Sequence, residues 1–155
     1  MGLFDFVKSA GRKEKEQEEA ERDEKNRELI KGNKILRYVI GLKLDVENLR
    51  VKFDDGVATV TGKAKSQAER EKVVLAVGNT EGVAQVDDQM EVVDPAAEAK
   101  FYAVKKGDSL SKIAKEFYGD AMKYPVIFEA NKPMLKDPDK IYPGQVLRIP
   151  QEGNE

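Results

Sequence analysis

The residue types that most often carry enzyme chemistry are scarce in this chain. It contains no Cys and no His, which excludes disulfides, thiolate nucleophiles, Cys/His zinc sites and histidine general bases. The remaining candidate acids and nucleophiles are Asp87, Asp88, Glu129 and Tyr118, and no spacing pairs a nucleophile with an activating base. We therefore expect a binding protein and not an enzyme.

Asp54 and Asp55 are adjacent in the sequence and could be interpreted as a functional pair of carboxylates. The pair is followed by Gly56 and stands between two stretches, residues 49–53 and 57–61, in which apolar and polar side chains alternate. An Asp-Gly pair between alternating stretches is typical of a tight hairpin turn, because glycine allows a positive φ. These carboxylates are therefore interpreted as turn residues at a solvated tip.

The overall charge is nearly balanced, with 27 basic and 29 acidic residues and a net charge of −2. This balance gives no reason to expect nucleic acid or an anionic membrane as a partner. No apolar run approaches the roughly 18–20 residues that span a bilayer. Asp5 and Lys8 interrupt the apolar start, and Phe6 replaces the Ser or Thr of a myristoylation motif. We expect a cytoplasmic monomer.

The opening stretch MGLFDFVKSAG, residues 1–11, is short and apolar. Its apolar residues are spaced as on one face of a helix, and Gly11 is a plausible helix end. A frayed end and a membrane-surface helix remain alternatives, but we expect a short helix that docks on a later domain, because exposed phenylalanines are a liability. The charged tract 12–28 is interpreted as a solvated helix or tether, so residues 1–26 form an N-terminal segment.

Residues 27–93 have the pattern of one small domain. An amphipathic helix, the hairpin, a second helix and an extended stretch follow one another, which predicts an α-β-β-α-β sandwich. Ser66 and Glu69 form a capping box at the start of the second helix, and Gly78-Asn79 ends it. The segment 94–100 contains a proline and small residues and is the expected linker.

Residues 101–150 form a second unit in the order β-α-α-β. Asp108 is the expected N-cap of its first helix, and Gly119 ends that helix. The remaining residues, 151–155, are expected to be disordered. Taken together, the two units predict an α+β protein of two small domains preceded by a short docking helix.

The C-terminal unit resembles a LysM domain, through VKKGDSLSKIA, FYGD, IFEAN and IYPGQVLRIP. LysM domains typically bind polymers of N-acetylglucosamine, so the resemblance implies glycan binding as one possible function. Alternatively, the same residues simply make the fold. The implied glycan groove would be formed by Gly107, Asp108, Ser109 and Leu110, with Asn131 and Ile141 opposite.

The middle unit resembles a BON domain, through VKFDDGVATVTG and GVAQVDDQ. The whole arrangement, with its short apolar start, is similar to small cytoplasmic bacterial proteins that join one BON to one LysM domain and bind potassium. This resemblance implies selective, reversible K⁺ binding with ordering of the domains, in support of K⁺ homeostasis or growth under stress. A stress-linked scaffold whose BON and LysM faces bind other proteins stays an open alternative.

Potassium favours several neutral oxygens, and backbone carbonyls supply them where a helix ends. The opening helix would act as a clamp that brings its terminal carbonyls to the turn after Gly78. The alternative is that Gly78 and Gly82 are ordinary turn glycines. By resemblance, the main-chain carbonyls that bind the ion are those of Val7, Ala10, Arg12, Gly78, Thr80 and Val83.

Overall fold

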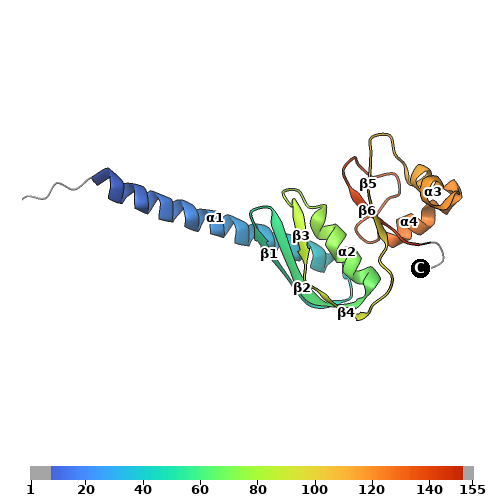
Figure 1. Cartoon of the computed structure of the whole chain (residues 1–155), viewed down its shortest axis with the longest axis horizontal. Coiled ribbons are helices and arrows are strands. Elements are labelled where there is room, and N and C mark those ends of the chain that lie inside the picture. Colours follow the sequence, from blue (N-terminus) through green and yellow to red (C-terminus); the bar gives the residue numbers. More distant parts are fainter. Residues whose placement is uncertain (1–7, 152–155) are drawn as a thin grey trace, which may run out of the picture.

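The computed structural model describes residues 8–151, with side chains from residue 15 onward. Two α/β units follow a long helix (Figure 1), which confirms the α+β prediction. None of the helices in this part of the chain combines the length and apolar character needed to cross a bilayer. The elements are α1 (Lys8–Gly41), β1 (Val46–Asp54), β2 (Val57–Ser66), α2 (Gln67–Gly78), β3 (Gln85–Asp88), β4 (Glu91–Asp94), β5 (Lys100–Ala103), α3 (Leu110–Tyr118), the 3-10 helix η1 (Ala121–Lys123), α4 (Tyr124–Ala130) and β6 (Val146–Ile149).

The first sheet is built around β2. The predicted hairpin is confirmed: β1 and β2 pair antiparallel, and Asp55 and Gly56 turn the chain with φ of 47° and 81°. On its other side β2 pairs in parallel with β3 and then with β4, where one continuous extended stretch was expected. The break follows from a local bond, because the Asp88 carboxylate accepts the N–H of Met90 at 3.0 Å.

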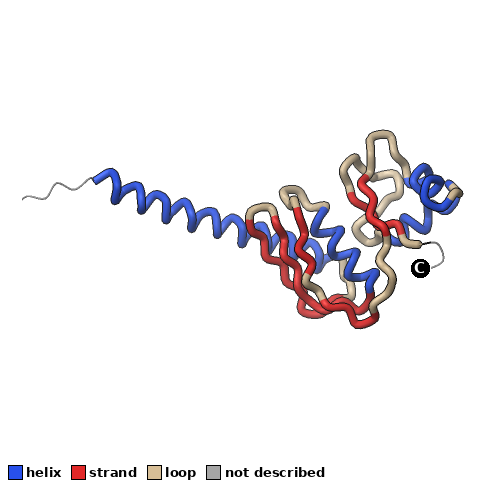
Figure 2. Tube along the Cα trace, in the orientation of Figure 1, coloured by secondary structure: helices blue, strands red, loops and turns tan. Residues whose placement is uncertain are grey.

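Two helices cover one face of this sheet (Figure 2). Ile35 of α1 and Val77 of α2 pack with Val60 of β2 in a core from which water is excluded. Gly32 allows the close approach of α1 to β1, since a Cβ there would lie 3.2 Å from the Val51 carbonyl oxygen. The buried members of this core are Ile35, Val39, Ala58, Val60, Val73, Ala76, Val77 and Met90.

The N-terminal half of α1 projects away from the sheet (Figure 1). All side chains from Lys15 to Arg27 are exposed, as the charged tract predicted. The predicted helix end at Gly11 is wrong, because α1 runs unbroken through it. A glycine inside a helix costs only about 1 kcal/mol relative to alanine, and the surrounding Lys, Glu, Ala and Arg residues are strong helix formers.

The second unit is small and has its own core. β5 and β6 pair antiparallel, and α3 and α4 pack against them around Ile113, Ile127 and Leu147. The helix end at Gly119 is confirmed, with φ of 76°. The N-cap of α3 was assigned wrongly, however. Ser109 directly precedes α3 and accepts the Lys112 N–H at 3.2 Å, whereas Asp108 accepts the Tyr102 hydroxyl and the Lys105 N–H.

Candidate functional site: the turn after α2 and the domain interface

The last turn of α2 uses most of its own carbonyl groups. The Asn79 N–H bonds to Leu75 at 2.9 Å, and the Thr80 N–H bonds to Val77 at 3.1 Å. The Thr80 hydroxyl donates to the Ala76 carbonyl at 3.0 Å. These bonds fix the end of α2. The carbonyl groups that follow Val77 belong to the turn.

The turn itself keeps free acceptors. Within residues 8–151, no protein donor bonds to the carbonyl oxygens of Gly78 or Val83. The Thr80 carbonyl accepts only the Val83 N–H, at 3.1 Å, so one of its lone pairs remains available. Gly82, at φ of 91°, bends the chain in a conformation that favours glycine. The turn therefore offers neutral oxygens on a short, well-held segment.

The structure does not bring the N-terminal carbonyls to this turn. Ala10 and Arg12 lie within α1, in the part that projects away from the first sheet (Figure 1), and their carbonyls face along the helix axis toward the N–H groups of the following turn. Val7 lies outside the described residues. Within the described residues, Ala10 and Arg12 therefore stand apart from the turn after α2 and do not form part of a short docking helix that ends at Gly11.

The turn is joined to the second domain through Asn79. The Asn79 side-chain Nδ2–H donates to the Val146 carbonyl at 2.8 Å, and the Asn79 side-chain Oδ1 accepts the Val146 N–H at 2.8 Å. Asn131 makes the same pair of bonds with Arg148, at 2.9 and 2.7 Å. Positions 146 and 148 share the edge of β6 that faces away from β5. Two side-chain amides therefore replace a third strand, and one of them comes from the BON unit.

A buried ion pair forms the centre of the interface. The Arg148 guanidinium of β6 donates to Glu71 Oε1 of α2 at 3.0 and 2.9 Å, and both side chains are almost fully buried. Glu71 Oε2 also accepts from the Gln67 amide at 3.2 Å and from the Ala99 N–H at 3.1 Å, which fixes the linker. Because all these donors converge on one carboxylate, the pair is fully hydrogen-bonded despite its burial.

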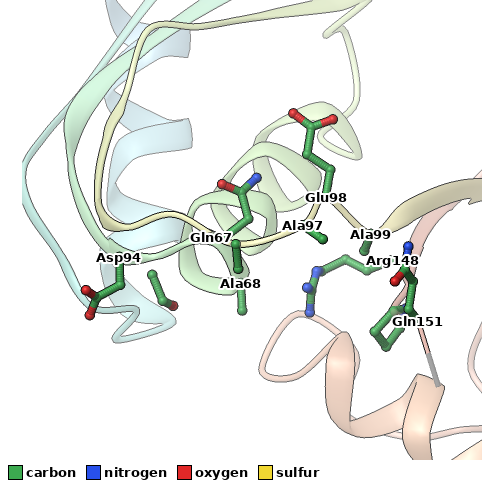
Figure 3. A pocket seen from close by; sticks show the side chains of 11 residues that line it. Gln67, Ala68, Asp94, Ala97, Glu98, Ala99, Arg148 and Gln151 are labelled. Atoms are coloured by element: carbon green, nitrogen blue, oxygen red, sulfur yellow. The ribbon is translucent and has the colours of Figure 1, made fainter. Parts of the chain in front are cut away.

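A pocket of about 360 Å³ lies beside this pair, between α2, the linker and the end of β6. Figure 3 shows Arg148 beside the linker residue Ala99 in this pocket. Sequence reasoning missed Glu71 and Arg148. Arg148 carried a signal, as a lone charged residue in the apolar strand VLRIP, but that signal did not indicate its partner.

A second groove of about 490 Å³ runs between the domains next to the turn. Asn79 and Thr80 line one wall, and Gln145 and Tyr142 line the other. Tyr38 of α1 also lines it, and burial, followed by the nearby Tyr142 phenol, raises the pKa of Tyr38. The turn thus borders a groove that residues of both domains line.

The residues implied for glycan binding have mixed positions. Leu110 is in the core of the second unit, and Asn131 is 1% exposed with both its amide nitrogen and its amide oxygen hydrogen-bonded. Asp108 accepts the Tyr102 hydroxyl at 2.6 Å and the Lys105 N–H at 2.8 Å. Ile141 packs against the same core. Gly107 is exposed and Ser109 caps α3, so only part of the implied groove is free to contact a ligand.

No group of three or more Asp and Glu side chains in the described part of the chain is arranged to hold a metal ion. A divalent-ion site of the usual carboxylate type is therefore not formed by these residues. What the described chain does offer a cation is the neutral oxygen set of the turn after α2.

Comparison with known proteins gives both domains a family. Residues 34–94 match the BON domain, and residues 102–150 match the LysM domain. Potassium binding protein Kbp of Escherichia coli is 48% identical over 153 residues, which covers 98% of this chain and 100% of that protein.

Two further relatives match smaller parts. An uncharacterized protein of Deinococcus radiodurans is 57% identical over 49 residues, 32% of this chain and 19% of its own length. The uncharacterized protein YqbP of Bacillus subtilis is 43% identical over 61 residues, 34% of this chain and 28% of its own length. The match to Kbp extends over both domains and the segment before them, and the chain therefore belongs to the family of BON–LysM proteins that includes Kbp.

Proposed function

We propose that this protein is a cytoplasmic, non-catalytic sensor or buffer that binds K⁺ reversibly through main-chain carbonyls. The observation that carries the proposal is the set of available carbonyls at the turn of Gly78, Thr80 and Val83. The name of the related Kbp, which refers to potassium binding, supports the choice of ion. Neutral carbonyl oxygens suit a large monovalent ion better than a divalent one, which favours carboxylates.

The proposed shell is completed by the carbonyls of Val7, Ala10 and Arg12. For this to occur, the first half of α1 must unwind and fold back over the BON domain. The side chains from Lys15 to Arg27 are exposed, so this stretch of α1 is held by helix propensity and not by tertiary packing. Isolated helices of such length are marginally stable in water, and the ion can therefore compete with the helix.

Ordering of the domains follows from the position of Asn79 between the turn and β6. An ion that fixes the turn would also fix the Asn79 side chain and, through its two 2.8 Å bonds, the edge of the LysM sheet. Asn79→Ala should keep K⁺ binding, but its two domains should unfold separately on heating. K⁺ should then raise the melting temperature of the BON domain alone. If K⁺ still stabilises both domains of Asn79→Ala equally, this coupling route is wrong.

The primary test is calorimetry of the tag-free protein with KCl against NaCl at equal ionic strength. Ion binding to the folded state should raise its stability by about 2.7 kcal/mol at a hundredfold excess over Kd. Deletion of residues 2–11 should abolish this response and leave the LysM domain folded. Equal melting in both salts would contradict K⁺ binding, whereas a persistent response after the deletion would contradict the N-terminal ligands only.

A glycine pair gives a matched test of the turn. Gly82 and Gly144 both have φ of 91°, so alanine at either position meets similar backbone strain. Gly82→Ala should weaken K⁺ binding, while Gly144→Ala, in the LysM loop, should lose similar stability and bind K⁺ normally. Equal K⁺ affinities in the two variants would place the ion elsewhere.

Glycan binding is the second candidate, and the LysM match over residues 102–150 favours it. Sedimentation of the protein with insoluble peptidoglycan would support this function, and the exposed Gly107 would then be a first position to substitute. The glycan hypothesis is discarded if the protein stays in the supernatant at every salt concentration.

A further inference from the structure

Lys31 of α1 places a positive charge against the turn after α2. A Cβ built on Gly82 would lie 3.5 Å from Lys31 Cε and 3.6 Å from Lys31 Nζ. The Lys31 residue is partly buried, and the Cε and Nζ end of its side chain lies beside Gly82. An ammonium group therefore stands within a few ångströms of the backbone that carries the free carbonyls.

This charge is not neutralised by a salt bridge. The ion pairs within the described residues involve the cations Lys65, Arg70, Lys132 and Arg148, and none involves Lys31. The turn also carries Glu81, whose exposed carboxylate would by itself draw divalent cations toward the carbonyls. The ammonium and the carboxylate thus oppose each other beside the same oxygen set.

We propose that Lys31 is a charge filter that makes the turn selective for monovalent over divalent cations. The inference rests on the proposed function, since it assigns the selectivity of the same turn. The Coulomb energy between two charges is proportional to their product, so the ammonium repels Ca²⁺ or Mg²⁺ twice as strongly as K⁺. If the ammonium lowers the affinity for K⁺ by a given factor, it therefore lowers the affinity for a divalent ion by the square of that factor.

A series at position 31 tests this filter with K⁺ and Ca²⁺ as separate titrants. Lys31→Met should raise the affinity for K⁺ about threefold and that for Ca²⁺ about tenfold, because the second factor is the square of the first. Lys31→Glu should increase both effects further, and Lys31→Arg should resemble the wild type. Lys63 is an exposed lysine toward the opposite end of β2, and Lys63→Met is the matched control, expected to change neither affinity.

The outcomes separate the two proposals. If the wild type binds K⁺ but Lys31→Met leaves both affinities unchanged, or changes them by the same factor, the filter is wrong and the K⁺ function stands. If the wild type gives no K⁺ signal, the proposed function fails and the filter fails with it. Circular dichroism and melting of each variant without added ion show whether the fold is intact, and Lys31→Gln replaces Lys31→Met if that variant unfolds.

Discussion

The two domains complete their central strands in different ways. In the BON domain, β2 is bonded on both sides by backbone, from β1 on one side and from β3 and β4 on the other. In the LysM domain, β6 has a backbone partner on one side only, and the amides of Asn79 and Asn131 bond the other side. A two-stranded sheet is marginal by itself. The LysM domain therefore depends on specific polar side chains, including one that belongs to its neighbour.

The interface follows the same principle. Met134 packs against both apolar cores, but the hydrogen bonds and the ion pair that fix the domains to each other are polar, and the Glu71–Arg148 pair is buried. Polar contacts of this kind require exact partners, whereas apolar packing tolerates substitution of similar volume. The comparison predicts that single polar substitutions damage the LysM side more than single apolar changes damage the BON side.

The largest effect is expected from Glu71→Ala. Removing one partner of a buried ion pair leaves the other charge uncompensated and costs about 3–5 kcal/mol. Here the Ala99 N–H and the Gln67 amide also lose their acceptor. Thermal unfolding should separate into two transitions. Lys65→Ala removes an exposed pair with Asp45 and is the control, with an expected change below about 1 kcal/mol. A similar loss in both variants would show that the interface pair has no special role.

The next effect concerns the edge of β6. Asn131→Leu keeps the volume but leaves the backbone N–H and C=O of Arg148 unsatisfied in a buried position, which should cost about 2–4 kcal/mol in chemical denaturation. Asn79→Leu should cost less, because the Asn79 site is only partly buried and water can replace the lost bonds. Equal losses would show that burial does not distinguish the two amides.

A smaller effect is expected in the BON domain, from Gly32→Ala. The added methyl group would approach the Val51 carbonyl oxygen at 3.2 Å and push α1 from β1, offsetting the gain in helix propensity. We expect a net loss of about 1 kcal/mol. Gly41→Ala is the control, since a Cβ at Gly41 meets no atom within 4 Å. If Gly32→Ala is more stable than the wild type, α1 can shift away from β1 without a loss of folding stability.

The smallest expected effect is a pH dependence of the folding stability of the LysM domain. The Tyr102 hydroxyl, followed by the Lys105 N–H, lowers the pKa of Asp108 below its usual 3.8, and the same bond raises the pKa of Tyr102 to about 12. The carboxylate therefore stabilises the fold above pH 3.8 and loses this contribution as the pH falls through its lowered pKa. The Tyr102 contribution is complete below pH 10 and is lost as the pH rises toward 12.

Asp108→Asn isolates this contribution. Its melting temperature should lie below that of the wild type at pH 7, and the difference should shrink as the pH drops below 3.8. Absorbance titration should show one of the five tyrosines ionising at lower pH in the variant. A constant difference at all pH values would show that the charge of Asp108 does not contribute.

Local signals in the sequence predicted much of the fold. Asp55-Gly56 indicated the hairpin, Gly78-Asn79 the end of α2, and Gly119 the end of α3, because each of these turns depends on residues next to each other in the chain. The predicted helix end at Gly11 was wrong because it also relied on a single local signal. A glycine ends a helix only where the residues after it do not favour the helix. The residues after Gly11 are strong helix formers, so α1 continues through it.

The sequence by itself determined two α/β units, their order and the end of α2 at Gly78, since these follow from periodicity and turn chemistry. Only the tertiary structure decided which distant groups meet: Glu71 with Arg148, Asn79 with Val146 and Lys31 with Gly82. The residues of each pair are at least 51 positions apart in the numbering of the chain, and no local pattern records such a partner. Contacts between domains depend on how whole elements pack, which is why the sequence predicted the end of α2 but not the groups that surround it.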